Sequence, residues 1–125
     1  MTRRIRGQPK VLIVDDEPDA REALKAVLEL DGYRTLSAAS AAEALALLAT
    51  QVPVCVILDL LMPDVGGAEL ARRIRADHGT GVVLIALTGS TRADDTLAAE
   101  AAGVDHLLHK PLDVKRLRTI LPPVA

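Results

Sequence analysis

Aromatic residues are nearly absent from this chain of 125 residues, which contains one tyrosine, Tyr33, and no phenylalanine or tryptophan. Hydrophobic residues nevertheless make up 50% of the sequence, so the core must consist mainly of Val, Leu, Ile and Ala. A chain of this length can bury such a core as one domain. We expect a single domain whose folded part covers residues 10–121, preceded by a frayed tail over residues 1–9.

The sequence also lacks a second cysteine, so Cys55 cannot form an internal disulfide. It lies inside an apolar run, where we expect a buried structural thiol rather than a reactive one. No apolar run approaches the roughly 20 residues of a membrane span, and no signal-peptide pattern opens the chain. We therefore expect a cytosolic (cytoplasmic) protein without a membrane partner.

A strong net charge is missing as well. The chain has 15 Lys and Arg against 17 Asp and Glu, a net charge of −2, so no overall basic field would attract nucleic acid. The basic residues near the N-terminus are interpreted as a solvated tail rather than a nucleic-acid-binding arm. We expect no direct nucleic-acid partner.

What the sequence has is a series of short apolar runs. Three of them are wholly or almost wholly apolar, as is typical of strands buried on both faces, and two are more mixed. The strands are expected at Val11–Val14, Thr35–Ala38, Gln51–Leu58, Val82–Leu87 and Val104–Leu108. The third run ends at a single carboxylate, Asp59, which we expect just past the carboxyl end of its strand because an unpaired charge inside would be costly.

Segments of helical periodicity fill the intervals between these runs. Pro18 suits the first turn of a helix that Gly32 ends. Ser40 and Glu43 fit a capping box for the second helix, and Asp113 is expected to cap the last.

The third and fourth helices are predicted from spacing alone. The third is expected to turn Leu70 inward and to direct its arginines, Arg72, Arg73 and Arg75, toward solvent. The fourth is expected to begin at Thr91, with Asp94 in its first turn. Its apolar positions would be Leu97, Ala98 and Ala101.

Five strands alternating with five helices predict an α/β fold with a parallel sheet covered on both faces. The three apolar strands belong in the centre and the two mixed strands at the edges. This placement favours the order 2-1-3-4-5, a doubly wound, flavodoxin-like (βα)5 sheet. Ligands of such sheets bind beyond the carboxyl ends of the strands, here between the first and third strands.

Polar residues follow four of the expected strands at that edge. They are Asp15, Asp16 and Glu17 after the first strand, Asp59 after the third, Thr88 after the fourth and Lys110 after the fifth. Clustered carboxylates repel one another, and a hard cation such as Mg²⁺, which takes oxygen ligands, relieves this repulsion. Such a site suits phosphoryl transfer to a carboxylate nucleophile, with a lysine holding a phosphate oxygen.

The sequence resembles the receiver domain of two-component response regulators in four segments: VLIVDDEPD, VILDLLMPDVGG, LIALTGS and HLLHKP. The resemblance covers residues 10–121, and it is specific because four separate positions agree in order and in their placement after strands. It implies a signalling switch rather than an enzyme. The implied partners are a histidine kinase or histidine phosphotransfer protein, a downstream output protein or effector domain, and a second copy in a phosphorylation-dependent homodimer.

The resemblance also implies a metal site. Asp59 matches the phosphoacceptor, Asp16 the direct ligand of Mg²⁺ (or Mn²⁺), and Asp15 the companion that acts through water. Leu61 would contribute its backbone carbonyl to the metal. Each match rests on the position of the residue within its motif.

Further matches concern the switch. Thr88 corresponds to the switch hydroxyl, Lys110 to the phosphate-contacting lysine, and Pro111 to a proline preceded by a cis bond. Gly67 corresponds to the loop glycine after the acceptor. The chain departs from the pattern at Leu107, where receivers often carry Tyr or Phe, so the usual pairing of threonine with an aromatic ring is in doubt.

Three other functions remain as alternatives. A phosphatase of the haloacid dehalogenase type needs a second acid two residues after its nucleophile, and here that residue is Leu61. A nucleotide or flavin binder needs a glycine-rich or hydroxyl-rich loop after the first strand, where this chain is acidic. A pseudo-receiver would take no phosphate, although here every acceptor and metal position is filled.

The chain ends after the fifth expected helix, so we expect no DNA-binding or enzymatic output domain within it. Whether it acts as a free-standing regulator or as part of a longer regulator or hybrid kinase stays open.

Overall fold

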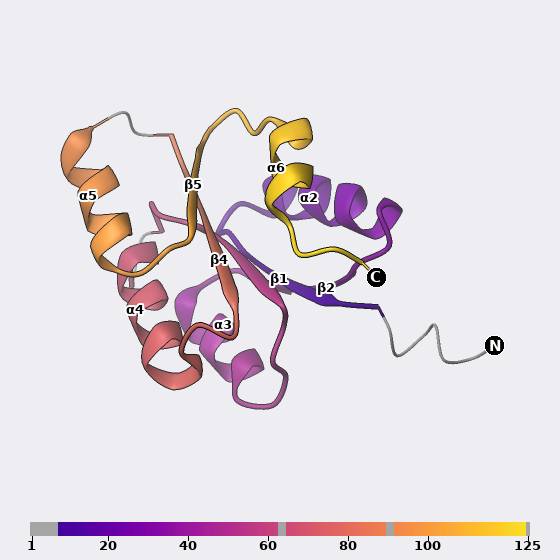
Figure 1. The fold of residues 1–125 in the computed structure, drawn as a ribbon, viewed down its shortest axis with the longest axis horizontal. Helices are drawn as coiled ribbons and strands as arrows, with labels where there is room; N and C mark the ends of the chain where they lie inside the picture. The colour runs from indigo at the N-terminus through magenta and orange to yellow at the C-terminus, as the bar shows by residue number, and fades with distance from the viewer. Residues whose placement is uncertain (1–7, 63–64, 90–91, 125) are drawn as a thin grey trace.

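The computed structural model describes residues 8–62, 65–89 and 92–124. In these ranges strands and helices alternate along the chain (Figure 1). The strands are β1 (Lys10–Val14), β2 (Arg34–Ala38), β3 (Cys55–Asp59), β4 (Val83–Thr88) and β5 (His106–His109). The helices are α2 (Pro18–Leu30), α3 (Ala41–Leu48), α4 (Gly67–His78), α5 (Ala93–Ala101) and α6 (Val114–Ile120). Most of the predicted N-terminal tail lies outside the described residues.

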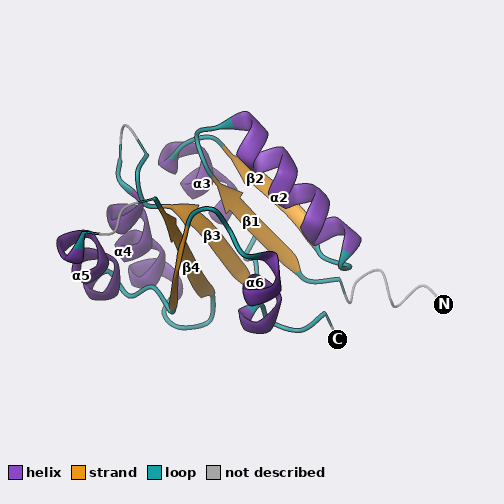
Figure 2. Cartoon of the chain, turned by 90° about the horizontal axis from the view of Figure 1, so that it is seen from above, coloured by secondary structure: helices purple, strands orange, loops and turns teal. Residues whose placement is uncertain are grey.

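All five strands are parallel and form one sheet in the order β2-β1-β3-β4-β5, which confirms the predicted topology. The strands β1, β3 and β4 are almost completely buried, whereas the edge strands β2 and β5 are partly exposed. Helices α2 and α6 cover one face of the sheet and α3, α4 and α5 the other (Figures 1 and 2). No helix in the described part of the chain is long and apolar enough to cross a membrane.

Alternate residues of each central strand enter different halves of the core. Leu12 of β1 packs in the half that includes Leu70 and Ile74 of α4. Its neighbour Ile13 packs in the half that includes Leu28 of α2. Because both faces are covered, a central strand must be apolar at every position, which is why its sequence is a continuous apolar run.

The helix caps predicted at Ser40 and Asp113 are present, and so is the glycine predicted to end the first helix. The Ser40 hydroxyl accepts a hydrogen bond from the Glu43 N–H at 3.2 Å, and the Glu43 carboxylate accepts from the N–H of Ala39 at 2.9 Å rather than from that of Ser40. The Asp113 carboxylate accepts from the first turn of α6. Gly32, with φ of 101°, follows the end of α2 in the left-handed region that favours glycine.

The prediction that Arg75 points to solvent is wrong. Its side chain is only 16% exposed, while Arg72 and Arg73 lie at the surface and pair with Glu69, as expected for solvent-facing arginines. Arg75 lies on the last turn of α4, where the turn that joins α5 to β5 passes close enough to accept its hydrogen bonds.

The predicted apolar face of α5 is also wrong. Ala99 is buried, whereas Leu97 is 61% exposed and Ala98 and Ala101 face solvent. The cap is Arg92, not Thr91, which lies outside the described residues. Five alanines between residues 93 and 102 make more than one face of this helix apolar, so spacing could not select the face that packs.

Candidate functional site

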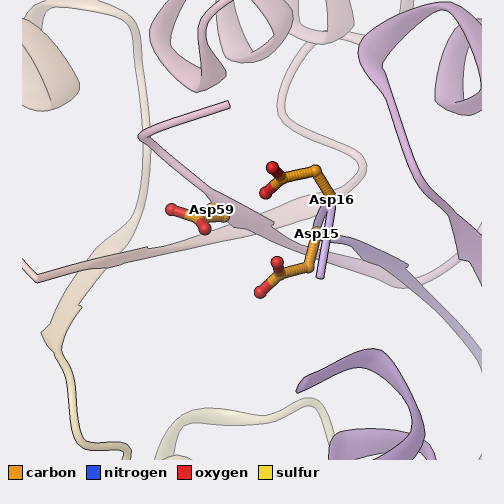
Figure 3. Close-up of side chains that lie close together, drawn as sticks. All are labelled: Asp15, Asp16 and Asp59. Atoms are coloured by element: carbon orange, nitrogen blue, oxygen red, sulfur yellow. The ribbon is translucent and has the colours of Figure 1, made fainter. Parts of the chain in front are cut away.

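Three carboxylates meet at the edge of the sheet where the strands end (Figure 3). Asp15 and Asp16 follow β1, and Asp59 is the last residue of β3 rather than the first residue past it. One oxygen from each side chain lies within 4.8 Å of the others. Asp15 and Asp59 are buried, and Asp16 is exposed.

The sheet topology explains why these residues meet. Strands β1 and β3 are parallel neighbours with Val14 opposite Leu58, so the residues that follow in both strands reach the same edge. On the other side of β1, the Asp15 N–H continues the pairing with β2 by donating to the Ala38 carbonyl at 3.1 Å. The Asp15 carboxylate in turn accepts from the Glu17 N–H at 2.9 Å, which bends the chain away from the sheet into α2.

Both oxygens of Asp59 have partners. Oδ1 accepts a hydrogen bond from the Leu61 N–H at 2.9 Å, and Oδ2 accepts from Lys110 Nζ at 3.0 Å. The same Nζ lies 3.7 Å from Asp15 Oδ2. Lys110 therefore bridges the two buried carboxylates, and its positive charge offsets part of their repulsion.

The acidic surroundings control the pKa of Lys110. Burial alone would lower this pKa, but the hydrogen bond to Asp59 and the charges of Asp59, Asp15 and Glu17 outweigh it and raise the pKa. Lys110 thus stays a cation throughout the neutral range.

Thr88 ends β4 at the same edge and is buried. Its backbone carbonyl accepts a hydrogen bond from the Lys110 N–H at 2.8 Å, so the segments that carry the hydroxyl and the ammonium are joined directly. The peptide bond between Lys110 and Pro111 is cis, as the resemblance implied. Leu107 is half-buried and packs against the core half formed with α3 and α4.

Gly67 is required by the close packing of α4 against the end of β3. A Cβ at this position would lie 2.5 Å from the Asp59 carbonyl oxygen and 2.7 Å from the Leu60 Cα. Real Cβ atoms do not approach backbone this closely, so any larger residue would displace the segment that carries Asp59. The resemblance identified this glycine, and the structure supplies the steric reason.

One residue beside the site was not predicted from the sequence. Arg21, on the first turn of α2, donates a hydrogen bond from Nη1 to the backbone carbonyl of Asp15 at 2.7 Å. The available signal was weak: a basic residue one turn into the helix that follows an acidic triplet.

Of the cavities in the described part of the chain, two bear on where the site lies. One of about 350 Å³ opens beside the carboxylates, between α2 and the segment after β5, and Asp15, Glu17 and Lys110 line its polar end. A larger one of about 560 Å³ lies between α3 and α4, away from the carboxylates. The carboxylate cluster, not the larger cavity, is where reactive groups gather.

The donor set fits a divalent cation. Three carboxylates offer only oxygen ligands, which hard cations such as Mg²⁺ prefer. Two of the acids are buried, and Lys110 supplies a single positive charge to the group. A second cationic charge would therefore be electrostatically favourable here.

Comparison with known sequences gives consistent matches. A family model described as the response regulator receiver domain matches residues 11–122. An uncharacterized 14.6 kDa protein of Leptolyngbya boryana is 39% identical over 108 residues, which cover 86% of this chain and 82% of that protein. The probable transcriptional regulatory protein TcrX of Mycobacterium tuberculosis is 33% identical, with coverage of 95% and 53%. The phosphate regulon transcriptional regulatory protein PhoB of Pseudomonas aeruginosa is 34% identical, with coverage of 89% and 51%. The chain spans about half the length of these two regulators.

Solved structures agree with the sequence matches. A response regulator receiver domain protein from Methanospirillum hungatei superposes with a TM-score of 0.85 at 28% identity, covering 90% of this chain and 89% of that one. A response regulator receiver protein from Pseudomonas putida gives a TM-score of 0.84 at 34% identity, with coverage of 90% and 93%.

Proposed function

The chain belongs to the response regulator receiver domain family and so is a receiver of two-component signalling, and from this premise we propose that Asp59 is its phosphoacceptor. The observation that carries the proposal is the position of Asp59. It is the one carboxylate of the cluster that ends a central strand, with one oxygen held by the Leu61 N–H and the other by Lys110.

The reaction we propose is transfer of a phosphoryl group from a phosphohistidine of a partner protein. A carboxylate oxygen of Asp59 attacks phosphorus and forms an acyl phosphate. The P–N bond to the donor histidine breaks, and its electron pair stays on the imidazole nitrogen. Lys110, which holds Asp59 Oδ2 before the reaction, is placed to stabilise the charge on the phosphoryl oxygens.

The carboxylates of Asp15, Asp16 and Asp59, with the backbone carbonyl of Leu61, would hold Mg²⁺ or Mn²⁺. When bound, such an ion neutralises charge on the oxygens of the transferring group. Support comes from the spacing of the carboxylates and from their chemistry as oxygen donors. We propose that Asp16, the exposed member, is the ligand through which the ion enters.

Phosphorylation would then act as a switch rather than as a step of an enzyme cycle. A phosphoryl dianion beside Lys110 and the Thr88 hydroxyl makes new charge-assisted hydrogen bonds. Reversing a 1:99 equilibrium needs about 5.5 kcal/mol, which a few such bonds of roughly 1.5–3 kcal/mol each supply. Since Leu107 has no polar group, we propose that the response passes through the loop after β4 with little change at Leu107.

The partners follow from the same premise. We propose that a histidine kinase or histidine phosphotransfer protein donates the phosphoryl group, and that this takes place in the cytoplasm. An output protein or effector domain would respond to the phosphorylated chain. A phosphorylation-dependent homodimer is a further proposal. We also propose that residues 10–121 act as one domain.

A direct test uses acetyl phosphate with Mg²⁺ and the intact mass of the protein. The wild-type chain should gain one phosphoryl group, and Asp59→Asn should gain none. Asp77→Asn, which removes an aspartate from α4 outside the cluster, serves as the matched control and should react like the wild type. A gain that survives Asp59→Asn, or no gain in the wild type, would refute the proposal.

A further inference from the structure

Arg21 makes a contact that the proposed reaction does not use. It lies on the first turn of α2 and is half-buried. Its own N–H donates to the Glu17 carbonyl at 3.1 Å as part of the helix, while its guanidinium reaches back to the Asp15 carbonyl at 2.7 Å. The side chain therefore joins the helix to the loop that carries two of the three carboxylates.

The carbonyl that Arg21 holds belongs to the peptide between Asp15 and Asp16. A peptide is planar, so its oxygen, its nitrogen and both flanking Cα atoms lie in one plane. Holding the oxygen restricts the orientation of that plane. Together with the backbone dihedrals of the two aspartates, this limits the directions in which their side chains leave the backbone. One hydrogen bond thus constrains two of the carboxylates in Figure 3.

Other contacts hold Asp15, and one of them also holds the peptide that follows Asp16. The Asp15 N–H donates to Ala38, and the Asp15 carboxylate accepts from the Glu17 N–H. Asp16 is exposed, and among the hydrogen bonds of the described residues none is formed by its carboxylate. The placement of its side chain therefore depends on the two peptides that flank it, one held by Arg21 and the other by the Asp15 carboxylate.

We propose that Arg21 is a positioning residue for the cation site: by holding the Asp15–Asp16 peptide it sets the geometry in which Asp16 binds Mg²⁺. This inference rests on the proposed function, because it assumes that the carboxylates bind the ion. Arg21 touches neither the phosphoryl group nor the ion. It acts through the backbone.

Charge alone predicts the opposite effect. A guanidinium near the cluster repels a cation, so removing it should strengthen Mg²⁺ binding if electrostatics dominate. Loss of positioning should weaken binding instead. Removing a group that orients metal ligands costs about 10- to 100-fold in metal affinity, and we expect the lower end here because Asp15 keeps its other contacts.

The test compares Arg21→Met with Lys25→Met. Lys25 lies on the same helix four residues later, and no hydrogen bond or ion pair of the described residues involves it, so its loss removes an equal charge without removing the contact. Binding of Mg²⁺ is measured by calorimetry and that of Mn²⁺ by electron paramagnetic resonance. The rate of phosphorylation by acetyl phosphate is measured as a function of Mg²⁺ concentration.

We expect Arg21→Met to bind Mg²⁺ about tenfold more weakly, with the half-maximal Mg²⁺ concentration for phosphorylation shifted equally and the rate at saturating Mg²⁺ unchanged. Lys25→Met should bind as the wild type or slightly more tightly. Arg21→Lys, which keeps the charge and one donor, should lie between Arg21→Met and the wild type.

Equal or tighter binding by Arg21→Met overturns the proposal. If Arg21→Met fails to fold, Arg21→Lys decides: weaker binding by a folded variant supports positioning, and wild-type binding overturns it. Failure of the proposed function looks different, because then neither the wild type nor Asp16→Asn would bind Mg²⁺.

Discussion

At the scale of single residues, Arg75 shows how one side chain can hold three segments together. Its guanidinium donates to the carbonyls of Gly79, Val82 and Gly103 at 2.9, 2.6 and 2.9 Å. It also pairs with Asp105, whose carboxylate accepts from the Leu84 N–H at 2.8 Å. The end of α4, the start of β4 and the turn before β5 are therefore fastened at the edge opposite the carboxylates.

We predict that Arg75→Met lowers the free energy of unfolding by about 2–4 kcal/mol, because several carbonyls lose a charged donor at once. Urea denaturation followed by circular dichroism measures this. Arg73→Met is the matched control, since Arg73 is exposed and pairs only with Glu69 in the described contacts. It should change stability by less than about 0.5 kcal/mol. Equal effects of the two variants would contradict the role given to Arg75.

A second prediction concerns Gly67. Gly67→Ala should cost about 1–3 kcal/mol of stability and should also slow phosphorylation, because the added Cβ would push on the backbone of Asp59. Gly66→Ala is the control, since a Cβ there would have nothing within 4 Å. Thermal unfolding and the rate with acetyl phosphate are measured for both variants. A Gly67→Ala protein as reactive as Gly66→Ala would show that the backbone yields without moving Asp59.

The buried thiol gives a pH dependence. Burial, with a smaller effect of the Asp105 charge, raises the pKa of Cys55 from 9.0 to about 12. The unfolded chain therefore loses the thiol proton first, so stability falls as the pH rises from 9 toward 12 and is unaffected by this group below pH 9. We predict that Cys55→Ala unfolds with a shallower pH dependence in that range, measured by urea titrations. If the free energy of unfolding fell equally with pH in the wild type and in Cys55→Ala, ionisation of the Cys55 thiol would be excluded as its cause.

At the scale of secondary-structure elements, the sequence predicted best where apolar content differed sharply between neighbours. Three apolar runs and two mixed ones were enough to order the strands, and the caps at Ser40 and Asp113 marked two helix starts. The buried face of a helix was predicted wrongly where the composition of the helix was uniform. The exposure of a side chain was predicted wrongly where its hydrogen-bond partners are remote in the sequence. The alanines of α5 gave no unique face, and Arg75 follows two exposed arginines of the same type.

The candidate site was predictable for a topological reason. Residues that follow parallel strands reach one edge, so Asp15, Asp59 and Lys110 could be placed together without side-chain detail. What could not be predicted were the contacts that other residues make with the backbone of these site residues. The contact of Arg21 with a backbone carbonyl and the closeness of Gly67 to Asp59 depend on the packing of helices against the sheet, which no local pattern encodes.

The fourth prediction tests the orientation of α5. Because Ala99 is buried and Ala98 is exposed, Ala99→Glu should destabilise the protein severely, by burying an unpaired charge. Ala98→Glu, one residue away, should stay within about 0.5 kcal/mol of the wild type. Urea denaturation compares the two variants. The orientation predicted from spacing, which buries Ala98, requires the reverse result.

At the scale of the whole molecule, the net charge of −2 hides an uneven distribution. Three acids are concentrated at one edge of the sheet, around a single lysine. This arrangement disfavours the unliganded fold through repulsion and favours binding of a cation. Stability and cation binding should therefore be coupled. A carboxylate of the cluster, such as Asp16, should lower the stability of the metal-free protein and strengthen the binding of a cation.

Asp16→Asn separates the two effects. Asp16 is exposed, so its loss should leave the metal-free protein as stable as the wild type or slightly more so, because one repulsive charge is removed. A ligand that binds only the folded state stabilises it by about 2.7 kcal/mol at 100 times its dissociation constant. The wild type should therefore gain stability when Mg²⁺ is added, and Asp16→Asn should gain much less.

The measurement is thermal unfolding with Mg²⁺ and with NaCl at matched ionic strength. Asp19→Asn, which removes an exposed acid on α2 outside the cluster, should respond to Mg²⁺ as the wild type does. The order of stability should thus reverse between the two salts: Asp16→Asn equal to or above the wild type in NaCl, and below it in Mg²⁺. Parallel behaviour of the two proteins in both salts would mean that the fold tolerates the clustered charges without using them to bind a cation.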